Sequence, residues 1–200
     1  MFENREEAAK LLSKKINFEF DIIAGILRGG FILAYVIARE KNKKAIPIIS
    51  RKLRVPFEKE LAFGAICEDI IVLNEYIIKE LKLKSEEIKE EIENQKKIIN
   101  EMKRIFGDEF TKIKNKRVLI VDDGIATGAT VKAAAKYMRK NNNEVIIGTP
   151  IIAHETYLEI SKEFKVIALE IPKIMPAIGM FYKDFREVKN EEILELMKKL

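Results

Sequence analysis

The chain has 200 residues, which suits one domain, and 48% of them are hydrophobic, enough for a buried core. The formal net charge is +5, but lysines and glutamates are interleaved and form no basic stripe with aromatic residues, which argues against a nucleic-acid partner. The single cysteine, Cys67, cannot form an internal disulfide, and the sequence has no signal-peptide pattern and no apolar run long enough to cross a membrane. We therefore expect a cytoplasmic protein with no membrane partner.

Hydrophobic periodicity divides the chain into short strands and helices that alternate. Strands are expected at residues 20–27, 45–50, 65–68, 70–73, 118–121, 144–149 and 166–170. Helices are expected at residues 5–15, 31–39, from 74 or 75, at 85–106, 131–140, 157–164 and 191–199. This order predicts an α/β fold with a mainly parallel sheet and helices on both faces, in one domain over residues 1–200. The amphipathic helix at 85–106 is interpreted as an insertion that packs on the sheet or contributes to a dimer interface.

A first candidate site lies where the strand at residues 20–27 ends. Arg28, Gly29 and Gly30 come next, and a helix follows at once. Backbone N–H groups at a helix N-terminus attract anions, and an arginine beside them adds a charge-assisted contact. The alternative interpretation is a glycine turn with an arginine on the surface.

Three cations follow the strand at residues 45–50, namely Arg51, Lys52 and Arg54. Such a run is commonly a solvated surface, but open α/β sheets bind ligands at the carboxyl ends of their strands. Glu60 comes a little later in the chain, and its carboxylate either accepts a proton from an incoming nucleophile or simply faces water.

Residues 116–130 read KRVLIVDDGIATGAT, and the functional prediction depends mainly on them. A buried strand ends in two adjacent carboxylates, Asp122 and Asp123, which can accept hydrogen bonds from vicinal hydroxyls or lie near a divalent cation. The loop that follows presents backbone N–H groups and threonine hydroxyls at a helix N-terminus, which favours a phosphate. We therefore predict a sugar phosphate across the strand end, and the alternative is a strand–turn–helix connection with solvated acids. The loop residues concerned are Gly124, Ala126, Thr127, Gly128, Ala129 and Thr130.

The segment VLIVDDGIATGAT resembles the phosphoribosyl-pyrophosphate loop of the type I phosphoribosyltransferases. The stretch KLRVPFEKELAFGAI resembles a subgroup of predicted phosphoribosyltransferases of unassigned substrate. The resemblance implies that Asp122 and Asp123 hold the ribose hydroxyls and that residues 126–130 hold the 5-phosphate. It also implies magnesium as the cofactor, which Asp122 and Asp123 hold directly or through ribose or water.

The segment GILRGG resembles the pyrophosphate loop of the same family, which implies that Arg28, Gly29 and Gly30 contact the leaving pyrophosphate. The family also has a mobile loop that closes over the pyrophosphate, and the resemblance assigns Lys52 and Arg54 to the closing contacts. Closure excludes water from a cation-like transition state.

Residues 170–185, EIPKIMPAIGMFYKDF, break the alternation of strands and helices and resemble the family's variable hood. In the family the hood recognises the base, which implies that Phe181 or Tyr182 stacks on it. The alternative is a C-terminal flap that only covers the core. Ala126 stands where the hypoxanthine–guanine enzymes have an aspartate, so the resemblance assigns no particular base.

The resemblance implies a pentosyltransferase that moves the 5-phosphoribosyl group from phosphoribosyl pyrophosphate to a small nucleophile, expected to be a nucleobase, and releases pyrophosphate. The catalytic residues would be Asp122, Asp123, Arg28 and Glu60. A homodimer is the expected assembly. The alternative function is a sensor of phosphoribosyl pyrophosphate or a nucleotide that uses the same fold without turnover.

Overall fold

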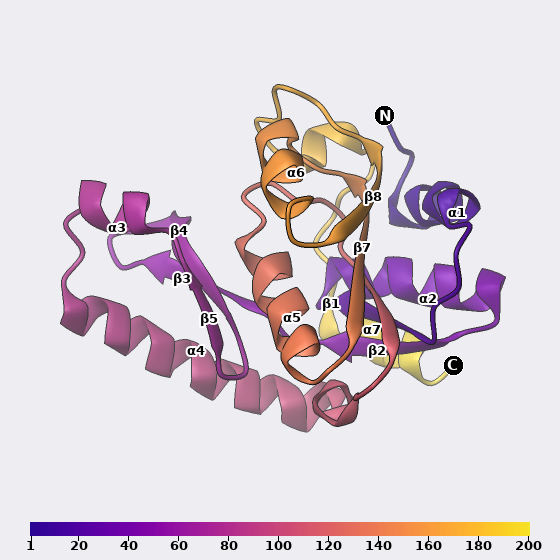
Figure 1. Cartoon of the computed structure of the whole chain (residues 1–200), viewed down its shortest axis with the longest axis horizontal. Helices are drawn as coiled ribbons and strands as arrows, with labels where there is room; N and C mark the ends of the chain where they lie inside the picture. The colour runs from indigo at the N-terminus through magenta and orange to yellow at the C-terminus, as the bar shows by residue number, and fades with distance from the viewer.

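The computed structural model describes residues 1–200, apart from the side chain of Lys59. Its centre is a five-stranded sheet in the order β2-β1-β6-β7-β8, and all four pairings between neighbouring strands are parallel (Figure 1). The predicted α/β fold with a mainly parallel sheet is therefore confirmed. The strands are β1 (Ile22–Ile26), β2 (Lys44–Ile48), β6 (Arg117–Val121), β7 (Glu144–Ile151) and β8 (Lys165–Glu170).

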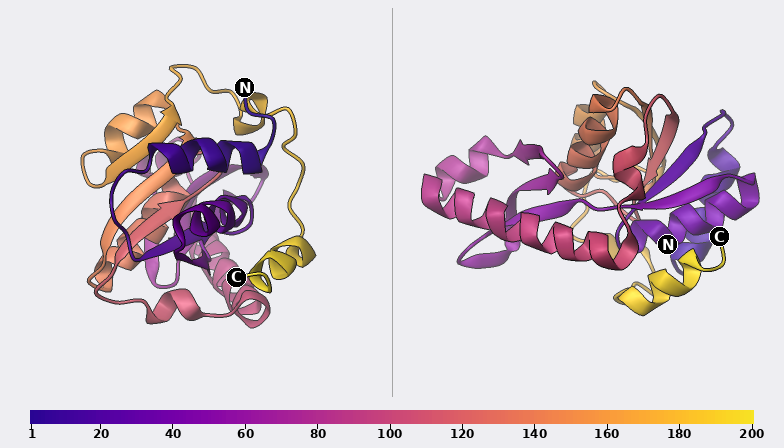
Figure 2. Two further views of the ribbon diagram at one scale, coloured as in Figure 1. Left: turned by 90° about the vertical axis from the view of Figure 1, so that its right-hand side faces the viewer. Right: turned by 90° about the horizontal axis from the view of Figure 1, so that it is seen from below.

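Helices cover both faces of this sheet. Side chains alternate in direction along each strand, so successive strand residues pack into two different cores. Ile23 and Leu119 belong to the core that α1, α2 and α7 cover, and in Figure 2 α1 and α2 lie side by side across the sheet. Ala24 and Ile120 belong to the core on the other face, which α5 covers. The helices are α1 (Arg5–Lys15), α2 (Gly29–Lys41), α5 (Ala129–Lys140), α6 (His154–Ile160) and α7 (Asn190–Met197).

A second sheet, which the sequence analysis predicted only in part, forms a lobe beside the first. Strands β3, β4 and β5 pair antiparallel, and α3 and α4 complete the lobe at the left of Figure 1. Phe63 and Ile66 are fully buried and belong to the same hydrophobic core as α5, so the two sheets share one core. The elements are β3 (Arg51–Val55), β4 (Glu58–Cys67), β5 (Ile70–Leu73), α3 (Glu75–Glu80) and α4 (Ser85–Phe106).

Several predicted boundaries hold and others need correction. Helix α1 has the predicted bounds, and the Asn4 side chain accepts a hydrogen bond from the Glu7 N–H at 2.9 Å. Helix α4 also has the predicted bounds, but its N-cap is Lys84, whose N–H donates to the Glu87 carboxylate at 2.8 Å. The basic run is part of strand β3, because it pairs with β4, and is not a loop. Two single turns of 3₁₀ helix occur at Glu109–Lys112 and Ile178–Phe181. No helix in the described part of the chain is both long and apolar enough to span a bilayer.

Candidate ligand-binding site

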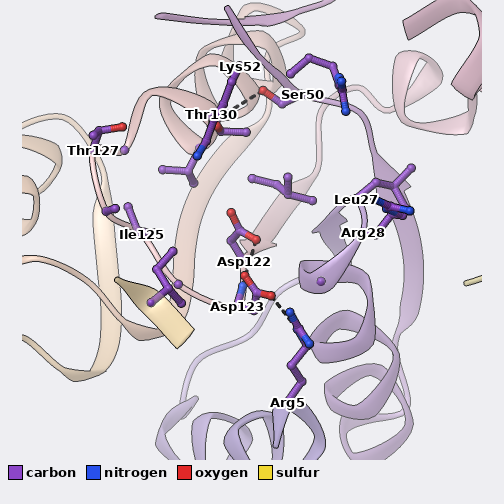
Figure 3. Close-up of a pocket in the computed structure, with 18 of the residues that line it drawn as sticks. Arg5, Leu27, Arg28, Ser50, Lys52, Asp122, Asp123, Ile125, Thr127 and Thr130 are labelled. Atoms are coloured by element: carbon purple, nitrogen blue, oxygen red, sulfur yellow. Dashed lines mark hydrogen bonds and ion pairs between the residues drawn. The ribbon is translucent and has the colours of Figure 1, made fainter. Parts of the chain in front are cut away.

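A cavity of about 360 Å³ lies at the carboxyl ends of β1, β2 and β6, where helices α2 and α5 begin. Figure 3 shows Asp122 and Asp123 near its centre, Arg5 reaching Asp123 from α1, and Lys52 with Thr130 on the opposite side. Five cationic side chains and two carboxylates line it, an excess of three positive charges. The lining residues are Arg5, Ile26, Leu27, Arg28, Gly29, Ser50, Arg51, Lys52, Arg54, Asp122, Asp123, Gly124, Ile125, Ala126, Thr127, Gly128, Thr130, Val131, Ile178 and Phe185.

The two acids at the end of β6 have different surroundings. Asp123 is 9% exposed, and its Oδ2 accepts a hydrogen bond at 2.6 Å from the Nε of Arg5, which is also buried. The backbone oxygen of Asp123 accepts from the hydroxyl of Tyr182 at 2.5 Å. Asp122 turns one carboxylate oxygen back to the N–H of Asp123 at 2.9 Å. Asp123 is thus fixed through both its side chain and its backbone. The Asp122 carboxylate bonds only to the next residue, while its backbone N–H donates to the carbonyl of Gly148 at 3.3 Å.

Both carboxyl groups are harder to ionise than ordinary aspartates. Burial raises the pKa of Asp122 well above its usual value, and the adjacent charge of Asp123 raises it further, while Lys52 opposes the change. Burial also raises the pKa of Asp123, although Arg5 opposes this. A ligand that brings hydroxyl donors or a cation to these carboxylates would stabilise their ionised forms.

The loop between β6 and α5, where an anion site is predicted, lines the cavity. Gly128 has φ +76° and precedes the first residue of α5, so an alanine here would adopt a strained left-handed conformation. The first N–H groups of a helix have no partner within it, and the residues at the start of α5 line the cavity together with Thr127 and Thr130. The hydroxyl of Thr156 donates to the carbonyl of Ala126 and ties the loop to α6.

A second helix N-terminus enters the cavity at Gly29, the first residue of α2. The guanidinium of Arg28, which lines the cavity, donates to the exposed carboxylate of Glu187 at 2.8 Å. A Cβ atom added to Gly29 would collide with Oδ2 of Asp123, so this loop packs directly against the acidic pair. The two glycine loops, which the resemblance assigns to one substrate, therefore line one cavity.

Strand β3 contributes cations to the same cavity. Arg51, Lys52 and Arg54 all line it, and burial, with the like charges of Arg54 and Arg28, lowers the pKa of Arg51. The Nε of Arg51 donates at 3.0 Å to the side chain of Gln95, which is 5% exposed on α4. Gln95 in turn donates to Glu91 at 2.9 Å. Helix α4 therefore fixes the position of the Arg51 guanidinium through Gln95.

Some predicted site residues lie elsewhere. Glu60 is exposed on β4 and is not among the residues that line the cavity. Phe181 does not line it either, and Tyr182 is buried, with its ring 5.3 Å from that of Phe2 and 4.8 Å from that of Phe185. Among residues 170–185, Ile178 and Phe185 line the cavity. Gly30 lies beneath it, where an added Cβ would be 2.5 Å from the carbonyl oxygen of Val121. Ala129 begins α5 beside the anion loop.

Other site residues were not anticipated from the sequence. Arg5 was predicted only as part of a helix, and neither its spacing nor its neighbours in the sequence indicate a site. Ser50 lies between β2 and β3. Its hydroxyl donates to the carbonyl of Thr130 at 2.8 Å and so joins this connection to the first turn of α5. Gln95 lies among the many charged and polar residues of α4, and the sequence does not distinguish it from them. Only contacts between distant parts of the chain reveal these three residues.

The described side chains include no group of three or more His, Cys, Asp or Glu residues arranged to hold a metal ion. The donor set instead suits Mg²⁺, which commonly takes one or two protein carboxylates and completes its shell with substrate phosphates and water. Asp122 and Asp123 are the carboxylates in the cavity. Chemically, the site combines acceptors for a diol with two anion-binding helix ends.

Residues 1–180 match the family described as phosphoribosyl transferase domain. Two Mycobacterium tuberculosis proteins, whose names class them provisionally as phosphoribosyl transferases, are each 30% identical to this chain over 208 aligned positions. The match covers 98% of this chain but 46% of each relative, so the chain spans about half the length of these curated relatives. The adenine phosphoribosyltransferase of Albidiferax ferrireducens is 31% identical over 132 positions, which cover 66% of this chain and 51% of that protein.

Among solved structures, a Thermus thermophilus protein superposes with a TM-score of 0.77 at 26% identity, over 99% of this chain and 98% of that one. The adenine phosphoribosyltransferase of Thermoanaerobacter pseudethanolicus superposes with a TM-score of 0.50 at 16% identity, over 82% of this chain and 78% of that one. The second similarity supports the fold alone. The first extends over nearly the whole of both chains and therefore includes the lobe built on β3, β4 and β5.

Proposed function

The chain belongs to the phosphoribosyl transferase domain family, and from this premise we propose that it transfers the 5-phosphoribosyl group of phosphoribosyl pyrophosphate to a small nucleophile and releases pyrophosphate. The observation that carries the proposal is the convergence of two helix N-termini, an acidic pair and an excess of positive charge in one cavity. A sugar carrying phosphate groups at both ends matches this arrangement in charge and in hydrogen-bonding capacity.

The ribose and its 5-phosphate would occupy the end of β6. We assign the 5-phosphate to the loop at residues 126–130, whose N–H groups and hydroxyls are tied in place by Thr156 and Ser50. We assign the ribose diol to Asp122 and Asp123, which can accept its hydroxyl protons in hydrogen bonds. Fixing the ring at these two places lowers the entropy cost of reaching the transition state.

The pyrophosphate would lie between the glycine loop and strand β3. Arg28, Gly29 and the N-terminus of α2 would bind it from one side, and Arg51, Lys52 and Arg54 from the other. As the bond at ribose C1 breaks, negative charge accumulates on the pyrophosphate, and cations already held in the cavity stabilise that charge. Asp122 and Asp123 place negative charge beside the electron-poor ribose centre that remains.

Magnesium fits this site as an ion that enters with the substrate. Asp122 and Asp123 would hold it, directly or through ribose hydroxyls and water. Neutralisation of the pyrophosphate charge is the chemistry that magnesium supplies when bound. Glu187 accepts from one Nη of Arg28 at 2.8 Å, and pyrophosphate would either use the other guanidinium donors or displace this carboxylate.

We propose that the acceptor is a nucleobase and approaches ribose along the wall formed by Ile178 and Phe185. Ile178 lies directly over Gly124, where an added Cβ atom would collide with the isoleucine side chain. Apolar contact of this kind favours a flat ring without naming one. The assignment of a stacking role to Phe181 or Tyr182, and of proton acceptance to Glu60, stays a prediction.

The proposal is tested by incubating the chain with phosphoribosyl pyrophosphate, magnesium and a panel of nucleobases and amines. Release of pyrophosphate together with a new mononucleotide, seen by chromatography for at least one acceptor, is the expected result. The variant carrying both Asp122→Asn and Asp123→Asn is the matched control and should release neither product. Tight binding of phosphoribosyl pyrophosphate without turnover across the panel would instead identify a sensor, and absence of binding would overturn both functions.

Three broader properties belong to the same proposal. We place the reaction in the cytoplasm, since the single cysteine, Cys67, is a buried free thiol and nucleotide metabolism is the expected context. We propose a homodimer as the assembly, which light scattering on the purified chain would test. We expect no nucleic-acid partner, and salt-dependent retention on RNA or DNA would contradict this.

A further inference from the structure

Arg5 occupies an unusual position for an arginine. It is only 9% exposed, although arginine is rarely buried unless it is paired. It is the first residue of α1, where the helix dipole disfavours a positive charge. It also lies in the wall of the cavity, 118 positions from its partner Asp123 in the sequence. Such departures from local preference concentrate at functional sites.

The side chain of Arg5 is held by contacts on several sides. Its Nε donates to Oδ2 of Asp123 at 2.6 Å, and its Nη1 donates to the backbone oxygen of Arg186 at 2.9 Å. The guanidinium carbon lies 4.0 Å from the centre of the Phe185 ring, in a cation–π arrangement. Arg5 therefore connects the N-terminal helix, the C-terminal segment and the acidic pair (Figure 3).

The neighbouring acid explains why such a contact is needed. Asp122 and Asp123 are adjacent in the sequence and both line the cavity, so their charges repel each other. Without an opposite charge, the Asp123 carboxylate would be free to rotate away from Asp122 and from any bound diol. The Arg5 guanidinium supplies the opposite charge and fixes Oδ2 of Asp123 beside Asp122.

We propose that Arg5 is a positioning residue for Asp123, which it holds in the orientation that accepts the ribose hydroxyls. The inference rests on the proposed function, because it assumes that the acidic pair receives the sugar. It predicts that Arg5 acts on the ribose half of the substrate and not on the pyrophosphate half, which other residues bind.

The test compares two partial ligands, ribose 5-phosphate and inorganic pyrophosphate, by calorimetry in magnesium buffer. Arg5→Met should weaken ribose 5-phosphate binding by about tenfold or more, as expected for loss of a charge-assisted contact, and should leave pyrophosphate affinity within about twofold. Lys10→Met, the same change at an exposed position of α1, should alter neither affinity. Equal weakening of both ligands by Arg5→Met would show a general structural effect and overturn the proposal.

A double-mutant cycle then asks whether Arg5 acts through Asp123. In the Asp123→Asn background, Arg5→Met should weaken ribose 5-phosphate binding by less than about twofold further. A full tenfold loss in that background would also overturn the proposal. If Arg5→Met does not fold, Arg5→Lys is tested instead, because it keeps the positive charge but not all three contacts. Arg5→Lys should weaken the binding of ribose 5-phosphate and leave that of pyrophosphate unchanged. An equal loss of affinity for both ligands would overturn the proposal.

A ligand-free measurement separates this inference from the proposed function. Urea unfolding of the same four proteins of the cycle should show coupling between Arg5 and Asp123, whether or not the chain turns over phosphoribosyl pyrophosphate. Failure of the wild-type chain to bind either partial ligand would count against the proposed function. Additive unfolding effects of the two substitutions would count against the role of Arg5.

Discussion

Removing one hydroxyl group, by Tyr182→Phe, tests how the acidic pair is anchored. The ring would keep its contacts with Phe2 at 5.3 Å and Phe185 at 4.8 Å, so the substitution isolates the hydrogen bond to the Asp123 backbone. That bond is buried, and a buried carbonyl that loses its donor costs about 2 kcal/mol. For a chain of this size we expect a fall in melting temperature of about 4–8 °C.

The assay is thermal and urea unfolding of Tyr182→Phe beside Tyr76→Phe. Tyr76 is 71% exposed, so loss of its hydroxyl should leave the free energy of unfolding within about 0.5 kcal/mol of the wild-type value. Tyr182→Phe should also weaken ribose 5-phosphate binding while pyrophosphate affinity stays near that of wild type, because it removes a contact of Asp123 and none of the residues assigned to pyrophosphate. Equal stability of the two variants would refute the argument that the hydroxyl holds the acidic strand end.

Three other substitutions examine separate parts of the site. Asp122→Asn should raise the melting temperature of the ligand-free protein at neutral pH, because burial raises the pKa of Asp122 and its ionised form opposes folding. For the same reason, the stability of the wild-type protein should rise as pH falls from neutral through the raised pKa of Asp122, so that its unfolding curves approach those of the variant. Gln95→Met should weaken pyrophosphate binding and spare ribose 5-phosphate, measured by calorimetry, since Gln95 orients Arg51. Gly29→Ala should weaken both ligands and lower stability by about 1–3 kcal/mol in urea, because its Cβ displaces Asp123.

The part of the site that lies within one stretch of sequence could be predicted. From β6 to α5 the sequence has an apolar run, two acids, two glycines and a helix-forming segment in close succession. Each of these features predicts one part of the observed strand, loop and helix. The pairing that brings Arg28 beside this loop follows from the parallel register of β1 and β6, in which Ile22 lies opposite Val118. Strand alternation and short connections are enough to suggest that arrangement.

Contacts between distant segments could not be predicted in the same way. The cations at residues 51–54 were expected in a loop because the family resemblance implied one there, although β3 alternates between exposed and buried side chains from Lys52 to Val55. Arg5 and Tyr182 reach Asp123 from opposite ends of the chain, and nothing local marks either one. The resemblance to the family's hood assigned base stacking to Phe181 or Tyr182, and no feature of the sequence indicated that the Tyr182 ring packs against Phe2 and Phe185.

The crystal structure of the chain with phosphoribosyl pyrophosphate and magnesium tests the central claim most directly. The account predicts the 5-phosphate against residues 126–130, the ribose hydroxyls within hydrogen-bond distance of Asp122 and Asp123, and the pyrophosphate against Arg28. A substrate bound elsewhere, or a ribose whose hydroxyls turn away from both carboxylates, would contradict it.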